Sequence, residues 1–120
     1  MERIALIAHD EKKEDLVRFV LRHKAKLEKY RLVATNTTGT SIEREAGLEI
    51  QKMLSGPLGG DMQIGAMVAE AKIKAVFFLR DPLTAHAHEP DIAALMKVCD
   101  THNVPLATNV ASAEMILAAL

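Results

Sequence analysis

Short apolar runs alternate with longer segments of helical periodicity along the 120 residues of the chain. Five runs predict β-strands, at residues 3–8, 31–34, 48–51, 75–79 and 104–107. The run at 75–79 is apolar on both faces, which is typical of a central strand, whereas 48–51 alternates apolar with polar residues as a half-exposed edge strand does. The strands therefore belong to a sheet with a buried centre.

The segments between the runs carry apolar residues three and four positions apart, the spacing of amphipathic helices. They predict helices from residue 14 to about 27, at 41–46, around 64–71, around 92–99 and at 111–120. Strands that alternate with helices form βαβ units. The sequence thus predicts an α/β fold, three-layer and doubly wound, in which a five-stranded, mostly parallel sheet carries helices on both faces. We expect one domain over residues 1–120.

Composition excludes several classes of function. With 15 basic and 16 acidic residues the net charge is -1, so the chain lacks the basic face expected of a nucleic-acid binder or an anionic-membrane ligand. The N-terminal apolar run ends at His9, too early for a signal peptide or a membrane span. The single cysteine, Cys99, permits no intramolecular disulfide. We expect a cytoplasmic protein with neither nucleic-acid nor membrane partners.

Polar and ionisable residues follow each predicted strand. In strand order these are His9, Asp10 and Lys13; residues 35–40; residues 55–61; residues 80–82; and Thr108 with Asn109. Because ligands of open parallel sheets bind beyond the carboxyl ends of the strands, these residues predict a binding site at that rim.

Two of the strand-end segments suit phosphate. Residues 35–39, Thr-Asn-Thr-Thr-Gly, offer hydroxyls and backbone N–H groups before a helix, although a simple capped turn has the same residues. Residues 55–61, Ser-Gly-Pro-Leu-Gly-Gly-Asp, let the backbone approach a ligand closely, and Lys13 supplies a cation. No Gly-Lys-Ser/Thr follows the glycines, so this is not a nucleoside triphosphate site. The expected ligand is a small phosphorylated molecule.

Acid–base chemistry has two candidate sources. Asp61 begins a helix, where it is either an N-cap or a general base held over the ligand. Residues 81–91 concentrate two histidines and three carboxylates. There, His86 and His88 with Asp91 and His9 are an alternative metal site.

These motifs together resemble the methylglyoxal synthase family. The matching segments are Ala8-His9-Asp10, residues 35–39, residues 54–61, Asp81-Pro82-Leu83 with His88 and Asp91, and Ala107-Thr108-Asn109. The resemblance spans nearly the whole chain. It implies a homohexameric lyase, without metal or other cofactor, that converts dihydroxyacetone phosphate to methylglyoxal and inorganic phosphate and is inhibited by phosphate.

The resemblance also implies residue roles. Asp61 matches the general base, and His9 and His88 match the groups that donate a hydrogen bond or a proton to the substrate oxygens. Asp10, Asp81 and Asp91 would orient these groups, with Asp91 able to relay protons. The residues that match phosphate contacts are Lys13, Thr35, Thr37, Thr38, Ser55 and Gly56.

The chain departs from the family pattern at a few positions. Asn36 replaces a glycine, and the family's longer tail, with an arginine that reaches the phosphate region, has no counterpart after Leu120. His86 lies outside the motif and is expected at the surface. Two other functions stay open. One is an effector-binding module of the kind that ends carbamoyl phosphate synthetase. The other is a metal-dependent hydrolase that uses His86, His88 and Asp91.

Overall fold

A computed structural model describes all 120 residues. Its five strands are β1 (Arg3–Ala8), β2 (Arg31–Thr35), β3 (Ile50–Met53), β4 (Ala75–Leu79) and β5 (Leu106–Ala107). They form one sheet in the order β3-β2-β1-β4-β5, and every neighbouring pair is parallel. The predicted α/β fold is confirmed, with β4 inside the sheet and β3 at an edge.

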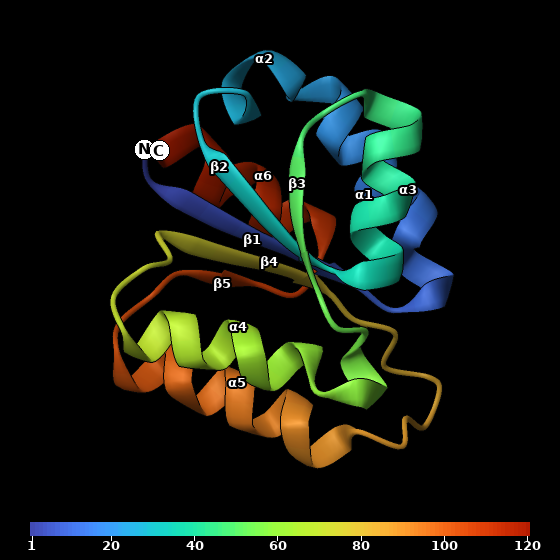
Figure 1. Cartoon of the computed structure of the whole chain (residues 1–120), viewed down its shortest axis with the longest axis vertical. Helices are drawn as coiled ribbons and strands as arrows, with labels where there is room; N and C mark the ends of the chain where they lie inside the picture. Colours follow the sequence, from blue (N-terminus) through green and yellow to red (C-terminus); the bar gives the residue numbers. More distant parts are fainter.

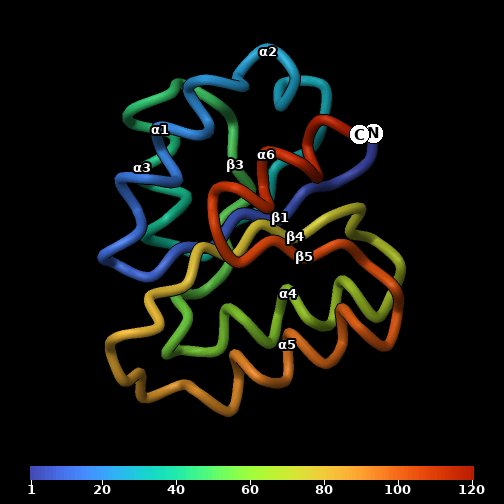
Figure 2. Tube along the Cα trace, turned by 180° about the vertical axis from the view of Figure 1, so that it is seen from behind, coloured from blue at the N-terminus to red at the C-terminus, as the bar shows by residue number.

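Helices cover both faces of this sheet (Figures 1 and 2). They are α1 (Lys13–Arg22), α2 (Lys24–Leu27), α3 (Asn36–Ala46), α4 (Gly60–Ala69), α5 (Glu89–Thr101) and α6 (Val110–Ala119), with 3-10 turns η1 (Asp10–Lys12) and η2 (Gly56–Leu58). Helices α4 and α5 lie together on one face, and α1, α3 and α6 lie on the other; the two termini are close together. None of these helices has the length and apolar character needed to cross a bilayer.

Alternation along the strands divides the interior into two cores. On β1, Ile4 and Leu6 face the core beneath α1, α3 and α6, whereas Ala5 and Ile7 face the core beneath α4 and α5. Phe77 and Phe78 divide in the same way. Because successive side chains of a strand point to opposite faces, a continuous apolar run is what a sheet covered on both sides requires.

Helix α3 begins five residues earlier than predicted, at Asn36 instead of Ser41. Its first turn holds threonines and Gly39, whose low helix propensity favours a turn. In the structure these residues are nevertheless helical and pack closely against β3. A Cβ at Gly39 would lie 2.6 Å from Cγ of Lys52 on that strand. The close approach of helix and strand explains the glycine.

Other boundaries shift for local reasons. Strand β5 contains two residues of the predicted run 104–107, because Pro105 has no N–H for the ladder and its carbonyl alone accepts from Val76. Strand β3 lies two residues after its predicted position. The helix expected to continue to Leu27 breaks at His23 into α1 and α2, and Ala71, expected in the helix before β4, has φ of 61° beyond its end.

The strand order positions the functional site. The chain runs outward from β1 through β2 to β3, then returns to the other side of β1 with β4. This reversal between β1 and β4 is the place where parallel sheets bind ligands, because the loops separate there.

Candidate active site

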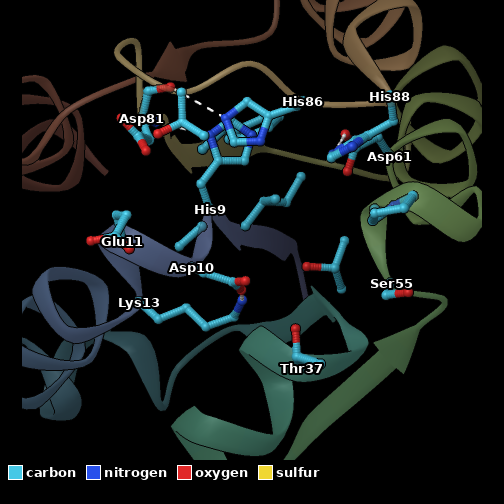
Figure 3. A pocket seen from close by; sticks show the side chains of 17 residues that line it. His9, Asp10, Glu11, Lys13, Thr37, Ser55, Asp61, Asp81, His86 and His88 are labelled. Carbon is cyan, nitrogen blue, oxygen red and sulfur yellow. Dashed lines mark hydrogen bonds and ion pairs between the residues drawn. The ribbon is translucent and has the colours of Figure 1, made fainter.

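A cavity of about 290 Å³ lies at the carboxyl ends of β1 to β4 (Figure 3). Its volume is at the small end of the range for ligand sites. Its polar lining residues are His9, Asp10, Glu11, Lys13, Thr35, Thr37, Ser55, Asp61, Asp81, Thr84, His86 and His88. The sequence-based expectation of a polar rim is therefore correct for four of the five strand ends.

The glycine loop between β3 and α4 is shaped by close backbone contacts. A Cβ at Gly60 would lie 1.8 Å from the carbonyl oxygen of Leu54, so only glycine fits. Gly59 has φ of 106°, in the region that favours glycine. These two residues turn the chain so that the first turn of α4 enters the cavity wall.

Asp61 lies in that first turn with a fully buried side chain. The N-cap position belongs to Gly59, and neither carboxylate oxygen of Asp61 has a hydrogen-bond partner, so the helix-cap alternative for Asp61 is wrong. Burial raises the pKa of this carboxyl above its ordinary value of 3.8, the charge of His88 lowers it, and that of Asp91 raises it. A desolvated carboxylate without donors is a stronger base than one in water.

His88 stands beside Asp61, with Nε2 3.6 Å from Oδ2 of the carboxylate. Its side chain is 11% exposed, and its Nδ1 is buried without a partner. The backbone of Gly56 leaves room for this ring, because a Cβ there would lie 2.7 Å from Nε2 of His88 and 3.3 Å from Oδ1 of Asp61. The glycine therefore keeps open the space over the acid–base pair.

His9 lies across the cavity, immediately after β1. Its Nδ1 accepts a hydrogen bond of 2.8 Å from the backbone N–H of Asp81, so in the neutral ring the proton sits on Nε2. That nitrogen is buried and has no partner in the protein. Burial above all, and then the neighbouring His86, His88 and Arg80, lower the pKa of His9 from 6.5 to about 4, although Asp81 opposes them. His9 is thus a neutral N–H donor at physiological pH.

Asp81 contributes through its backbone. Its carboxylate accepts from the N–H of Leu83 at 3.0 Å, and a hydrogen bond from the Thr84 side chain, the larger effect, holds the pKa of Asp81 below its usual value. The carboxylate therefore stabilises the turn after β4. This turn holds the backbone N–H of Asp81 in the position from which it donates to His9.

The cavity also has an anion wall, formed by Lys13, Thr35, Thr37 and Ser55. Thr35 is the N-cap of α3 but makes no side-chain cap, so the backbone N–H groups of the first turn keep their capacity to bind an anion. Thr37 and Ser55 line this wall, and Lys13 reaches it from α1 (Figure 3). A hydrogen bond from Lys13 lowers the pKa of Asp10, whose side chain is otherwise exposed.

Three expected contributors lie outside the cavity lining. The hydroxyl of Thr38 is buried and contacts Thr35 and the carbonyl of Ala8 at 3.2 and 3.4 Å, so it supports the wall from behind. Asp91 is half-buried on α5 beyond His88. Asn109, at the fifth strand end, caps α6 by accepting from the N–H of Ser112 and lies with Thr108 in a neighbouring cavity.

The expectation that His86 lies at the surface is wrong. Its ring stacks on His9 with centroids 3.7 Å apart, inside the cavity. Glu11 and Thr84 also line the cavity and carried no signal in the sequence, whereas the His-x-His spacing was a signal for His86. No three His, Cys, Asp or Glu side chains are arranged to hold a metal ion, so the ligand set of His86, His88, Asp91 and His9 does not form.

His23 is half-buried, and its Nε2 bonds to Glu114 at 2.6 Å. The guanidinium of Arg80, in the cavity next to the site, contacts the sulfur of Met96 at 3.5 Å.

Known proteins match this chain over nearly its whole length. A family model described as MGS-like domain matches residues 15–108. A methylglyoxal synthase from Cupriavidus taiwanensis is 61% identical over 118 residues, covering 98% of this chain and 89% of that protein. A methylglyoxal synthase from Thermus thermophilus is 59% identical, covering 98% and 94%. The crystal structure of methylglyoxal synthase from Elizabethkingia anophelis superposes with a TM-score of 0.91 at 47% identity, covering 97% and 76%.

Proposed function

Because the chain belongs to the methylglyoxal synthase family, we propose that it is a lyase that converts dihydroxyacetone phosphate to methylglyoxal and inorganic phosphate, and that residues 1–120 act as one domain. The observation that carries this proposal is Asp61, a fully buried carboxylate in the cavity wall with no hydrogen bond to either oxygen. Burying a carboxylate without partners is costly, and a catalytic base explains why the cost is tolerated.

The first step is proton abstraction. Asp61 removes a proton from the hydroxymethyl carbon next to the substrate carbonyl, and the electron pair of that C–H bond moves to the carbonyl oxygen. The carbon acid is weak, so the negative oxygen needs a donor as it forms. The buried Nε2–H of His9 is that donor, and a neutral imidazole is suited to the role because it does not reduce the basicity of Asp61 as a cation would.

The second step is loss of phosphate. The C=C electron pair of the enediolate shifts to form a double bond to the other carbon, and the bond between that carbon and the phosphate oxygen breaks. In the same step the hydroxyl on the former hydroxymethyl carbon loses its proton and becomes the aldehyde. The leaving phosphate takes up one of the two released protons and departs as the dianion, and the remaining enolate takes up the other on its terminal carbon, which gives methylglyoxal. His88, 3.6 Å from Asp61, is placed to exchange these protons with it, and Asp91 adds negative charge behind them.

The phosphate group occupies the anion wall in this proposal. The backbone N–H groups at the start of α3, the side chains of Thr35, Thr37 and Ser55, the N–H of Gly56 and the Lys13 cation contact it, with Thr38 supporting Thr35 and Asp10 holding Lys13. These contacts stabilise the departing phosphate dianion. Free phosphate would bind the same wall, so we propose that inorganic phosphate inhibits the enzyme.

Assembly and location complete the proposal. A homohexamer is supported by exposed apolar side chains at the glycine loop and α4, with Leu58 and Met62 exposed by 71% and 59%. A cytoplasmic location is supported by the lone Cys99, which is buried and free. Analytical ultracentrifugation tests the hexamer directly.

Turnover of dihydroxyacetone phosphate tests the activity. We expect the purified protein to release methylglyoxal and phosphate in equal amounts, with no change after treatment with a chelator. A protein that binds phosphate but forms no methylglyoxal would instead be an effector-binding module. A loss of activity on chelation would favour a metal-dependent enzyme.

A further inference from the structure

His9 is held between two aromatic side chains. Its ring packs face to face with His86, at a centroid distance of 3.7 Å and an interplanar angle of 24°. On the sheet side it meets Phe78 edge-on, at 5.1 Å and 77°. Phe78 belongs to the core beneath α4 and α5, so the position of the His9 ring is fixed on one side by that core and on the other by His86.

The backbone of Asp81 joins the two histidines. Its N–H donates to Nδ1 of His9 at 2.8 Å, and its carbonyl oxygen accepts from Nε2 of His86 at 3.3 Å (Figure 3). Hydrogen bonds to the backbone of Asp81 therefore help to orient both rings. Loss of His86 would leave the His9 ring with one hydrogen bond and its edge contacts to Phe78 and His88 to define its angle.

We propose that His86 is a positioning residue for His9: its stacked ring and its bond to the Asp81 carbonyl keep the Nε2–H of His9 directed at the substrate carbonyl. The proposal rests on the lyase activity proposed above and adds a residue to it. The ring of His86 stacks on His9 and lies farther from His88, at a centroid distance of 5.8 Å, so the effect of His86 on the reaction passes through His9.

The charged groups around His9 influence its protonation state. The titratable and charged groups that line the cavity or adjoin it come from three segments. They are His86, His88, Arg80 and Asp81 after β4, Asp10, Glu11 and Lys13 after β1, and Asp61 on α4. Burial is the largest influence on His9, and His86 comes second in disfavouring its protonated form. His86 thus helps to keep His9 neutral, and the neutral ring is the form whose Nδ1 accepts from the N–H of Asp81.

Variants at position 86 test the proposal. His86→Ala removes the ring, His86→Phe restores a stacking surface without the bond to Asp81, and His102→Ala, at the exposed end of α5, is the matched control. We expect His86→Ala to lower kcat by about 10- to 100-fold with little change in KM, because the anion wall is untouched. His86→Phe should recover part of kcat, and the control should match the parent protein.

Nuclear magnetic resonance of ¹⁵N-labelled His9, recorded without substrate, separates this proposal from the activity itself. In the parent protein His9 should stay neutral down to its pKa of about 4, with the proton on Nε2. In His86→Ala the pKa of His9 should move toward 6.5, the ordinary value, and the two ring nitrogens should become mixed tautomers. Unchanged His9 resonances and an unchanged kcat in His86→Ala would overturn the proposal, whatever substrate the protein uses.

Discussion

The carboxylate of Asp61 lies 3.6 Å from the imidazole of His88, and the space above the pair stays open because residue 56 has no side chain. The base, its proton-exchange partner and the glycine come from α4, the loop before α5 and η2. Their arrangement makes the role of each of these residues measurable on the purified protein.

Replacing Asp61 with Asn should separate catalysis from folding. We expect kcat to fall by about 10²- to 10⁴-fold, because the amide cannot accept the substrate proton. Binding of inorganic phosphate, followed by calorimetry, should persist. The variant's Tm should equal or exceed that of the parent, since a buried carboxylate that accepts no hydrogen bond is replaced by a neutral amide. Near-parental turnover would show that Asp61 is not the base.

Stability should respond to pH through the same residue. Above pH 3.8, the ordinary pKa, the unfolded carboxyl is ionised while the folded one retains its proton, because burial raises the pKa of Asp61. The folded state then binds more protons, so this residue's contribution to stability falls as pH rises from 3.8 through the folded-state pKa. Denaturant titrations should show the advantage of Asp61→Asn growing over that range. An advantage that does not vary with pH would contradict a raised pKa.

A methyl group at position 56 should block the site without unfolding the protein. Gly56→Ala places its Cβ 2.7 Å from Nε2 of His88, so the ring must move away from Asp61, and we expect kcat to fall with only a small change in Tm. Gly65→Ala, inside α4, is the control, because the only neighbour near its Cβ is Leu95 of α5, at an ordinary contact distance of 3.8 Å. That change should keep activity and raise stability by about 0.5–1 kcal/mol. Equal activities in the two variants would contradict the role of Gly56.

Lys13 should serve substrate and inhibitor alike. We expect Lys13→Gln to raise KM for dihydroxyacetone phosphate and the inhibition constant for phosphate together, by about 10- to 100-fold, the strength of a hydrogen bond to a charged group. The rise in Tm that phosphate causes in the parent should shrink in parallel. Lys72→Gln, on an exposed pair with Glu70, is the control. A change in KM without a change in phosphate inhibition would place the two anions at different sites.

The sequence alone determined the layered fold and the rim that carries the site. Continuous apolar runs such as 75–79 indicate strands buried on both faces, and this signal needs no knowledge of what packs on them. The strand-end rule then located His9, Thr35, Ser55 and Asp81 at one edge. Boundaries failed where a neighbour overrides local propensity, as at Gly39 against β3.

Tertiary structure decided what each residue at the rim is able to do. The tautomer of His9 depends on the N–H of Asp81, 72 positions away, and the inward place of His86 depends on His9. Asp61 has the same sequence pattern as a helix cap, and only its burial without partners distinguishes a base from a cap. Burial, ring stacking and hydrogen bonding arise between segments distant in the chain. Periodicity and motif spacing describe one segment at a time, so the chemical role of each of these residues becomes apparent only in the folded protein.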